Sequence, residues 1–136
     1  MCATADIVVD TSVIIAVIAN ELEKPALVAR TTGATLLAPT LLPWEVGNAF
    51  YAMLKRRRIT LAQAQLALKV YRQIALRLVD VELSEALELS DRFGIYAYDA
   101  YVLQSALRLR LPLLTLDQRL GASAKRAGVM VLELEQ

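Results

Sequence analysis

The sequence contains no histidine and only one cysteine among its 136 residues. The absence of histidine excludes imidazole metal ligands, Ser-His and Cys-His nucleophile pairs, and the commonest general base of enzymes. The single cysteine, Cys2, has no second cysteine in the chain with which to form a disulfide bond. Any chemistry must therefore rely on carboxylates, hydroxyls, lysines or arginines.

Long apolar runs are also missing, although 57% of the residues are hydrophobic. The longest purely apolar run, Val13 to Ala19, is far too short to cross a membrane. No basic segment or apolar stretch precedes Asp6, so the N-terminus does not resemble a secretory signal. We expect a soluble, cytoplasmic protein that forms one domain over residues 1–136.

An excess of charge of one sign is also missing, because the formal net charge is only +1 at pH 7. The field of the whole protein would not attract nucleic acid strongly, so a site for a polyanion must be a local patch. One such patch is the basic run Lys55-Arg56-Arg57-Arg58. These residues suit a solvent-exposed helix C-terminus, and they equally suit a surface that grips RNA phosphates. The sequence leaves both interpretations open.

Short apolar runs alternate with longer amphipathic ones along the whole chain. This alternation is typical of an α/β domain with a parallel sheet and helices on both of its faces. The expected strands are residues 7–9, 35–38, 78–81, 113–115 and 129–132, and the expected helices are residues 13–20, 25–32, 43–57, 61–76, 84–93, 98–110 and 118–126.

Four acids lie where such a sheet places its ligands. Asp10 directly follows the first expected strand, and Asp117 comes two residues after Thr115, which ends the fourth. Glu45 and Asp99 lie in the opening turns of the helices after the second strand and before the fourth. Open parallel sheets bind ligands beyond the carboxyl ends of their strands. We therefore expect the four carboxylates to converge on one divalent metal ion.

A purely structural interpretation of each acid is also available, because Asp commonly caps a helix and Glu in a first turn offsets the helix dipole. The apolar and aromatic neighbours of Asp10, Glu45 and Asp99 favour a shared site, since an isolated carboxylate is costly to bury. Oxygen ligands without histidine or paired cysteines point to Mg²⁺ or Mn²⁺ rather than zinc.

Four segments that contain these acids, taken in order, resemble the motifs of the PIN domain family. They are Val9-Asp10-Thr11-Ser12-Val13, Glu45-Val46-Gly47-Asn48-Ala49, Tyr98-Asp99-Ala100-Tyr101-Val102-Leu103-Gln104-Ser105-Ala106 and Leu114-Thr115-Leu116-Asp117. More narrowly, the chain resembles the VapC-type toxins of toxin–antitoxin pairs. The resemblance implies a PIN-like three-layer sandwich around a five-stranded parallel sheet in the order 3-2-1-4-5. It also implies a magnesium-dependent ribonuclease that forms homodimers and is inhibited by a VapB-type antitoxin.

The same resemblance suggests a role for each site residue. Asp10 and Asp99 would be the main metal ligands, and Glu45 and Asp117 would complete the acidic pocket directly or through water. Ser12 and Thr115 would orient these ligands by hydrogen bonds. The expected reaction is hydrolysis of RNA by an in-line water, with the metal ion offsetting the charge that develops on the phosphate.

Other interpretations fit less well. A haloacid dehalogenase-type enzyme would need a second aspartate two residues after Asp10, where this chain has Ser12. A receiver-type phosphoacceptor would need a lysine after the last strand, where only Glu133 and Glu135 are charged. A PIN fold that binds RNA or a protein without cleaving it stays open as the alternative. The aromatic residues at helical spacing are expected in the core or at a dimer contact rather than on RNA bases: Trp44, Phe50, Tyr51, Tyr98 and Tyr101.

Overall fold

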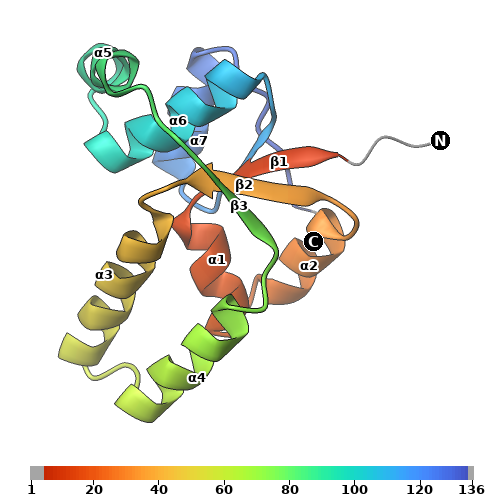
Figure 1. Ribbon diagram of the computed structural model, residues 1–136, viewed down its shortest axis with the longest axis vertical. Helices are drawn as coiled ribbons and strands as arrows, with labels where there is room; N and C mark the ends of the chain where they lie inside the picture. The colour runs from red at the N-terminus through yellow and green to blue at the C-terminus, as the bar shows by residue number, and fades with distance from the viewer. Residues whose placement is uncertain (1–4, 135–136) are drawn as a thin grey trace.

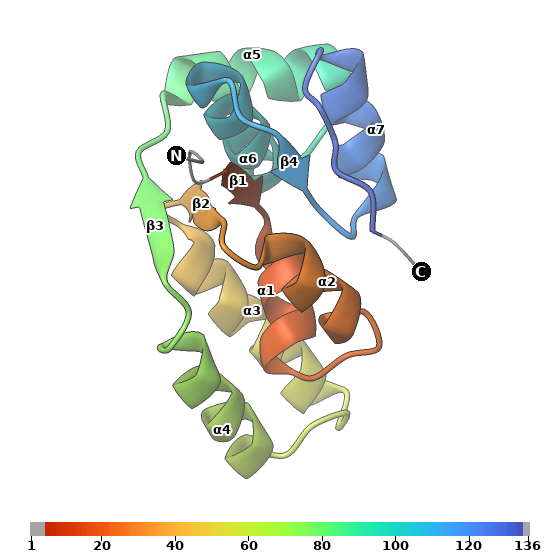
Figure 2. The ribbon, with the colours of Figure 1, turned by 90° about the vertical axis from the view of Figure 1, so that its right-hand side faces the viewer.

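The computed structural model describes residues 5–134, and Cys2 lies outside this range. Its centre is a parallel sheet in the order β3-β2-β1-β4. Figures 1 and 2 show α1 to α4 on one face of this sheet and α5 to α7 on the other, so the expected three layers are confirmed. The strands are β1 (Asp6–Val9), β2 (Thr35–Pro39), β3 (Leu76–Val79) and β4 (Leu113–Leu114). The helices are α1 (Thr11–Ile18), α2 (Lys24–Thr31), α3 (Leu42–Lys55), α4 (Leu61–Tyr71), α5 (Leu83–Phe93), α6 (Ala97–Leu109) and α7 (Gln118–Arg126).

Two cores, one on each face of the sheet, explain why Ile7 to Val9 of β1 and both residues of β4 are apolar. Ile7 and Val9 pack with α1 to α4, whereas Val8 between them packs with α5, α6 and α7. The neighbouring strand β4 repeats this alternation, with Leu114 in the first core and Leu113 in the second. Strands of a parallel sheet covered on both faces are apolar at every position, as β1 is from Ile7 onward.

The fifth expected strand, residues 129–132, is not a strand in the structure. The segment forms a single parallel bridge between Val131 and Leu113, on the side of β4 where a fifth strand would lie. Leu113 accepts from Leu132 N–H and donates to Met130 C=O, both at 2.9 Å. Because β4 has only two residues before the chain turns toward Asp117, it offers no second position for pairing. The expected order is thus confirmed for four strands, and the expectation of a fifth is wrong.

The elements of the structure begin and end within two residues of their expected bounds, except for one helix, whose end also moves the start of the strand after it. The helix expected to reach Leu76 ends at Tyr71, where turn hydrogen bonds from Gln73 and Ile74 to Val70 and Tyr71 close the chain. Leu76 instead begins β3, because it pairs with Leu36 of β2. Within residues 5–134, none of the helices is both long enough and apolar enough to span a membrane.

The register of β1 and β4 sets the position of the functional residues. Val9 pairs with Leu114, the last residues of the two strands. The next residues, Asp10 and Thr115, therefore leave the sheet side by side at its carboxyl edge. The helices α1 and α7 begin at this same edge, directly after β1 and shortly after β4 (Figure 2).

Candidate active site at the carboxyl edge of the sheet

The buried carboxylate of Asp10 lies at the centre of the site. The residue is only 5% exposed, and it directly precedes α1. Ser12 Oγ donates to its Oδ1 at 2.6 Å, and Thr115 Oγ1 donates to its Oδ2 at 2.8 Å. Burial raises the pKa of Asp10, and the charge of Asp117 adds to the rise, whereas these two hydrogen bonds and the backbone amide of Val13 partly oppose it. A helix cap would explain a carboxylate that directly precedes α1. The hydrogen bond from Thr115, which follows β4, goes beyond such a cap.

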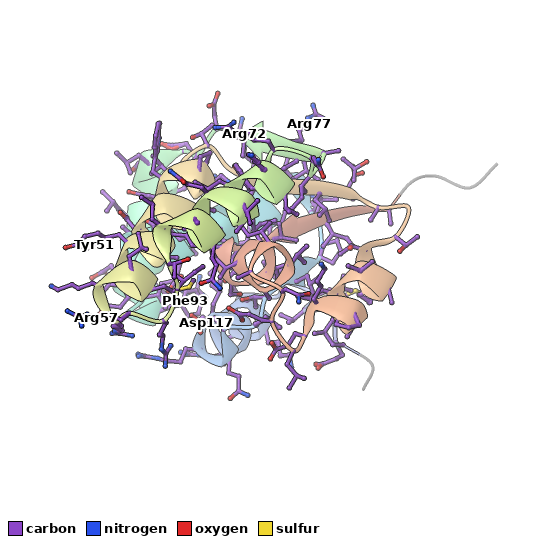
Figure 3. The ribbon with its side chains drawn as sticks, turned by 90° about the horizontal axis from the view of Figure 1, so that it is seen from below. Tyr51, Arg57, Arg72, Arg77, Phe93 and Asp117 are labelled. Carbon is purple, nitrogen blue, oxygen red and sulfur yellow. The ribbon has the colours of Figure 1, made fainter. Side chains whose placement is uncertain are left out.

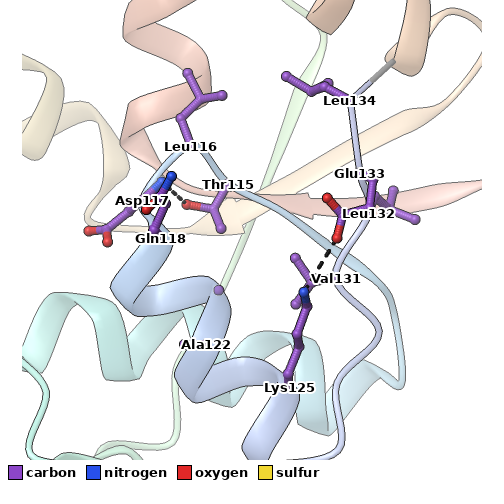
Figure 4. A pocket seen from close by; sticks show the side chains of 11 residues that line it. Thr115, Leu116, Asp117, Gln118, Ala122, Lys125, Val131, Leu132, Glu133 and Leu134 are labelled. Carbon is purple, nitrogen blue, oxygen red and sulfur yellow. Dashed lines mark hydrogen bonds and ion pairs between the residues drawn. The ribbon is translucent and has the colours of Figure 1, made fainter. Parts of the chain in front are cut away.

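Two backbone amides fix the direction of these hydrogen bonds. Leu116 N–H donates to Ser12 Oγ, and Asp117 N–H donates to Thr115 Oγ1, each at 3.0 Å; Figure 4 shows the second of them. Each hydroxyl thus accepts from an amide and points its own proton at the Asp10 carboxylate. The segment between β4 and α7 is thereby tied to Asp10, which is held in one orientation.

Asp99, in the first turn of α6, faces the same space and is partly buried. Burial is the largest cause of a rise in the pKa of Asp99 to about 6. The negative charges of Asp117, Asp10 and Glu45 add to this rise, and the guanidinium of Arg119 opposes it. The charges of the other three acids thus reach Asp99, and the convergence of all four on one metal ion stays a prediction.

The two remaining acids also have structural contacts. Asp117 caps α7, because its Oδ1 accepts from the amides of Arg119 and Leu120 at 2.9 and 3.1 Å. Glu45, in the first turn of α3, accepts from Asn48 Nδ2 at 3.2 Å. The capping interpretation is therefore correct for one oxygen of Asp117, and its Oδ2 is left for the cleft.

The sequence pattern of the PIN domain family matches residues 7–126. The chain belongs to the PIN domain family. The matched range contains all four acids of this PIN domain and both hydroxyls that hold Asp10. No curated protein sequence matches it.

Several solved structures share the fold of this PIN domain. PAE2754 from Pyrobaculum aerophilum is 25% identical with a TM-score of 0.71, over 93% of this chain and 83% of that one. VapC20 from Mycobacterium tuberculosis, described as a sarcin-ricin loop cleaving toxin, is 15% identical with a TM-score of 0.62, over 93% and 98%. VapBC2 from Rickettsia felis, bound to a DNA fragment from their promoter, is 12% identical with a TM-score of 0.66, over 96% and 99%. At such low identities the last two show a shared fold alone.

The donor set of this PIN domain fits a hard divalent cation. Asp10 is a buried carboxylate, and no lysine or arginine within residues 5–134 forms an ion pair with it. Each of its oxygens accepts one hydroxyl and keeps a lone pair for an ion. No three acidic or cysteine side chains in that range are close enough together to hold an ion by themselves. Mg²⁺ commonly keeps several waters and uses one or two carboxylates, a requirement that this arrangement meets.

Tyr98 belongs to the cleft although the sequence pattern suggests only a core residue. Its hydroxyl accepts a hydrogen bond from Thr11 Oγ1 at 2.9 Å. Burial, and then the charges of three of the acids, raise the pKa of Tyr98. The phenol is therefore a neutral hydroxyl among carboxylates, and its proton is available to a ligand in the cleft.

Arg119 is the second side chain that the sequence analysis missed. It lies in the first turn of α7, where a positive charge opposes the helix macrodipole. That unfavourable position is a weak sign in the sequence of a role for Arg119, and it does not indicate where the side chain points. Arg119 forms no ion pair within residues 5–134, but its charge lowers the pKa of Asp99.

The basic run lies at the opposite end of α3 from Glu45. Lys55 ends α3 and Arg56 to Arg58 form the turn that follows, with all four side chains exposed. Arg57, labelled in Figure 3, adopts a left-handed conformation with φ of 56°. Arg56 lies about 16 Å further along the axis of α3 than Glu45. Whether the run contacts RNA stays a prediction.

The aromatic residues divide between core and surface. Phe50 is buried, as expected, and Tyr98 packs edge-to-face on Tyr101 with ring centroids 6.4 Å apart. Trp44 and Tyr51 are 71% and 64% exposed, so a place in the core is wrong for these two, and their place at a dimer contact stays a prediction. Both lie on α3, whose outer face is thus unusually aromatic.

Proposed function

We propose that this PIN domain is a Mg²⁺- or Mn²⁺-dependent endoribonuclease, and that it is the toxin of a VapBC-type toxin–antitoxin pair. One observation supports the nuclease proposal: the charges of Asp10, Glu45 and Asp117 all act on Asp99, and the buried Asp10 has no cationic partner within residues 5–134. The toxin proposal is supported by the shared fold with VapC20 of M. tuberculosis and VapBC2 of R. felis.

Each residue of the site would have its own role in the proposed reaction. Asp10 and Asp99 would hold the ion, with Glu45 and Asp117 completing the shell directly or through water. A bound ion supplies positive charge that offsets the charge developing on the scissile phosphate. Ser12 and Thr115, which donate to the two oxygens of Asp10, would keep them oriented toward the ion. A carboxylate left outside the metal shell is available to take a proton from the attacking water.

The proposed partners are an RNA substrate, a VapB-type antitoxin and a second copy of the chain. Support for protein partners comes from the α3–α4 hairpin, which exposes a group of large apolar side chains. They are Trp44, Tyr51, Leu61, Leu66 and Val70. Light scattering of the purified chain, alone and with the small protein encoded beside it, tests both assemblies.

The decisive experiment is cleavage of structured RNAs, including a sarcin–ricin hairpin, by antitoxin-free protein with Mg²⁺, Mn²⁺ or EDTA. We expect metal-dependent cutting that is lost in Asp10→Asn. Asp6→Asn is the matched control, because Asp6 begins the same strand that Asp10 follows. It should cut like the wild type.

Cutting that persists in EDTA, or in an Asp10→Asn, Asp99→Asn double variant, would refute the proposed site. Metal-independent RNA binding by folded protein without cutting would favour the alternative, a PIN-fold binding module.

A further inference from the structure

A pocket of about 490 Å³ opens beside the acids, on the side of α5. It lies between the end of α5, the connection to α6 and the first turns of α6 and α7, and Asp99 and Asp117 form part of its wall. Its other lining residues are Ser90, Gly94, Ile95, Tyr96, Arg119 and Leu120. A volume in this range is typical of sites for small organic ligands. We refer to it as the α5–α7 pocket.

Arg119 gives the α5–α7 pocket a positive group beside two acids. The side chain is exposed, and within residues 5–134 it forms no ion pair. Its guanidinium is close enough to Asp99 to lower the pKa of that carboxyl. An unpaired guanidinium can bind a phosphate through two parallel hydrogen bonds. A phosphate held there would lie directly beside the acidic cleft.

Tyr96 gives the same pocket an aromatic ring. The residue is 81% exposed, and although it precedes α6 its side chain makes no capping hydrogen bond. A large ring with neither a packing nor a capping role is available for a ligand, and bases stack well on tyrosine. Ser90 also lines the pocket, and its Oγ is shielded from solvent without a hydrogen-bond partner among the described residues.

We propose that the α5–α7 pocket binds the nucleotide next to the scissile phosphate, with Arg119 on its phosphate and Tyr96 stacked on its base. The proposal rests on the proposed function for its position relative to the cut. It assigns substrate selection to α5, α6 and α7, on the opposite side of the sheet from the basic run.

The test is the binding of adenosine 5'-monophosphate and of adenosine to the full chain with Mg²⁺, followed by amide NMR shifts. Neither compound contains a phosphodiester, so binding is measured whether or not the protein cuts RNA. We expect shifts centred on residues 90–96 and 119–120. Arg119→Gln should lower the affinity for the monophosphate about tenfold and leave the affinity for adenosine unchanged. Tyr96→Leu should lower the affinity for both ligands about tenfold, whereas Tyr96→Phe should bind them like the wild type.

Arg77→Gln is the charge-matched control, because Arg77 lies on β3 and Figure 3 shows it on the opposite side of the molecule from Asp117. The proposal would be overturned if neither compound binds, or if the NMR shifts centre outside residues 90–96 and 119–120. Equal effects of Arg119→Gln and Arg77→Gln on binding would also overturn it. These outcomes hold even for a protein that cuts RNA. Binding with the expected variant pattern in a protein that cuts no RNA would support a nucleotide pocket and remove the proposed ribonuclease activity.

Discussion

Replacing Thr115 by valine tests whether the site is built around a charged Asp10. Valine keeps the shape of threonine but removes the hydroxyl that donates to Asp10 Oδ2 and accepts from Asp117 N–H. A hydrogen bond to a charged group contributes about 1.5–3 kcal/mol, and the stranded amide adds about 1 kcal/mol. We expect the metal-free protein to lose about 3 kcal/mol of stability, or about 10 °C in Tm.

The sign of the pH dependence makes this prediction specific. The pKa of Asp10 lies above its ordinary value of 3.8 in the folded protein, so the metal-free protein loses stability as pH rises from 3.8 through the folded pKa. Thr115→Val removes a group that favours the charged form, so it raises that folded pKa further. The loss should therefore be larger at pH 7.5 than at pH 4, where Asp10 is closer to neutral in both proteins.

Urea unfolding in EDTA at these two pH values measures the effect. Thr31→Val is the control, because its hydroxyl donates to Leu27 C=O within α2 and touches no ionisable group. A loss for Thr115→Val that is the same at both pH values, or no larger than that of Thr31→Val, would show that the hydroxyl does not support a charged Asp10.

Two further predictions concern charge. Asp99→Asn should stabilise the metal-free protein by about 1 kcal/mol at pH 7.5, because the folded pKa of about 6 lies above 3.8 and the exposed part of the carboxyl is screened. Urea unfolding should show no such gain at pH 4, and a gain at both pH values would contradict this origin. Changing Arg56 to Arg58 to alanine should weaken RNA binding and reduce its salt slope by about two, if these residues grip phosphates. RNA affinities at 50 and 200 mM salt measure this effect, and a variant with Arg30, Arg77 and Arg108 changed to alanine is the control. Unchanged affinity would mean that the basic run only suits the C-terminus of α3.

The parts of the fold that were predictable are those with one dominant local cause. Ile7 to Val9 is a strand because both of its faces are covered, and the helix over Gln118 to Arg126 has the expected bounds because Asp117 caps it. The bounds of β3 depend on pairing with β2, and the last segment fails to form a strand because β4 is too short. Neither of these distant partners can be read from the local pattern.

The candidate site divides in the same way. The proximity of Asp10 and Asp117 follows from the ends of β1 and β4, which meet at one edge of the sheet, so the order of strands and acids along the chain is enough to predict it. The directions of Tyr98 and Arg119 depend on how α6 and α7 pack, and the sequence pattern does not indicate them. Pairing with distant residues, rather than composition, sets these details.

The bond between Asp10 and Thr115 joins residues 105 positions apart, and this separation has a consequence for the order of events during synthesis. The first acid is made early, but the hydroxyl that orients it and the last acid are made only after α6 is complete. A chain still short of β4 therefore carries no finished catalytic centre. If the protein is the proposed ribonuclease, the messenger and ribosome that produce it are protected from it by sequence order alone, until nearly the whole domain has emerged.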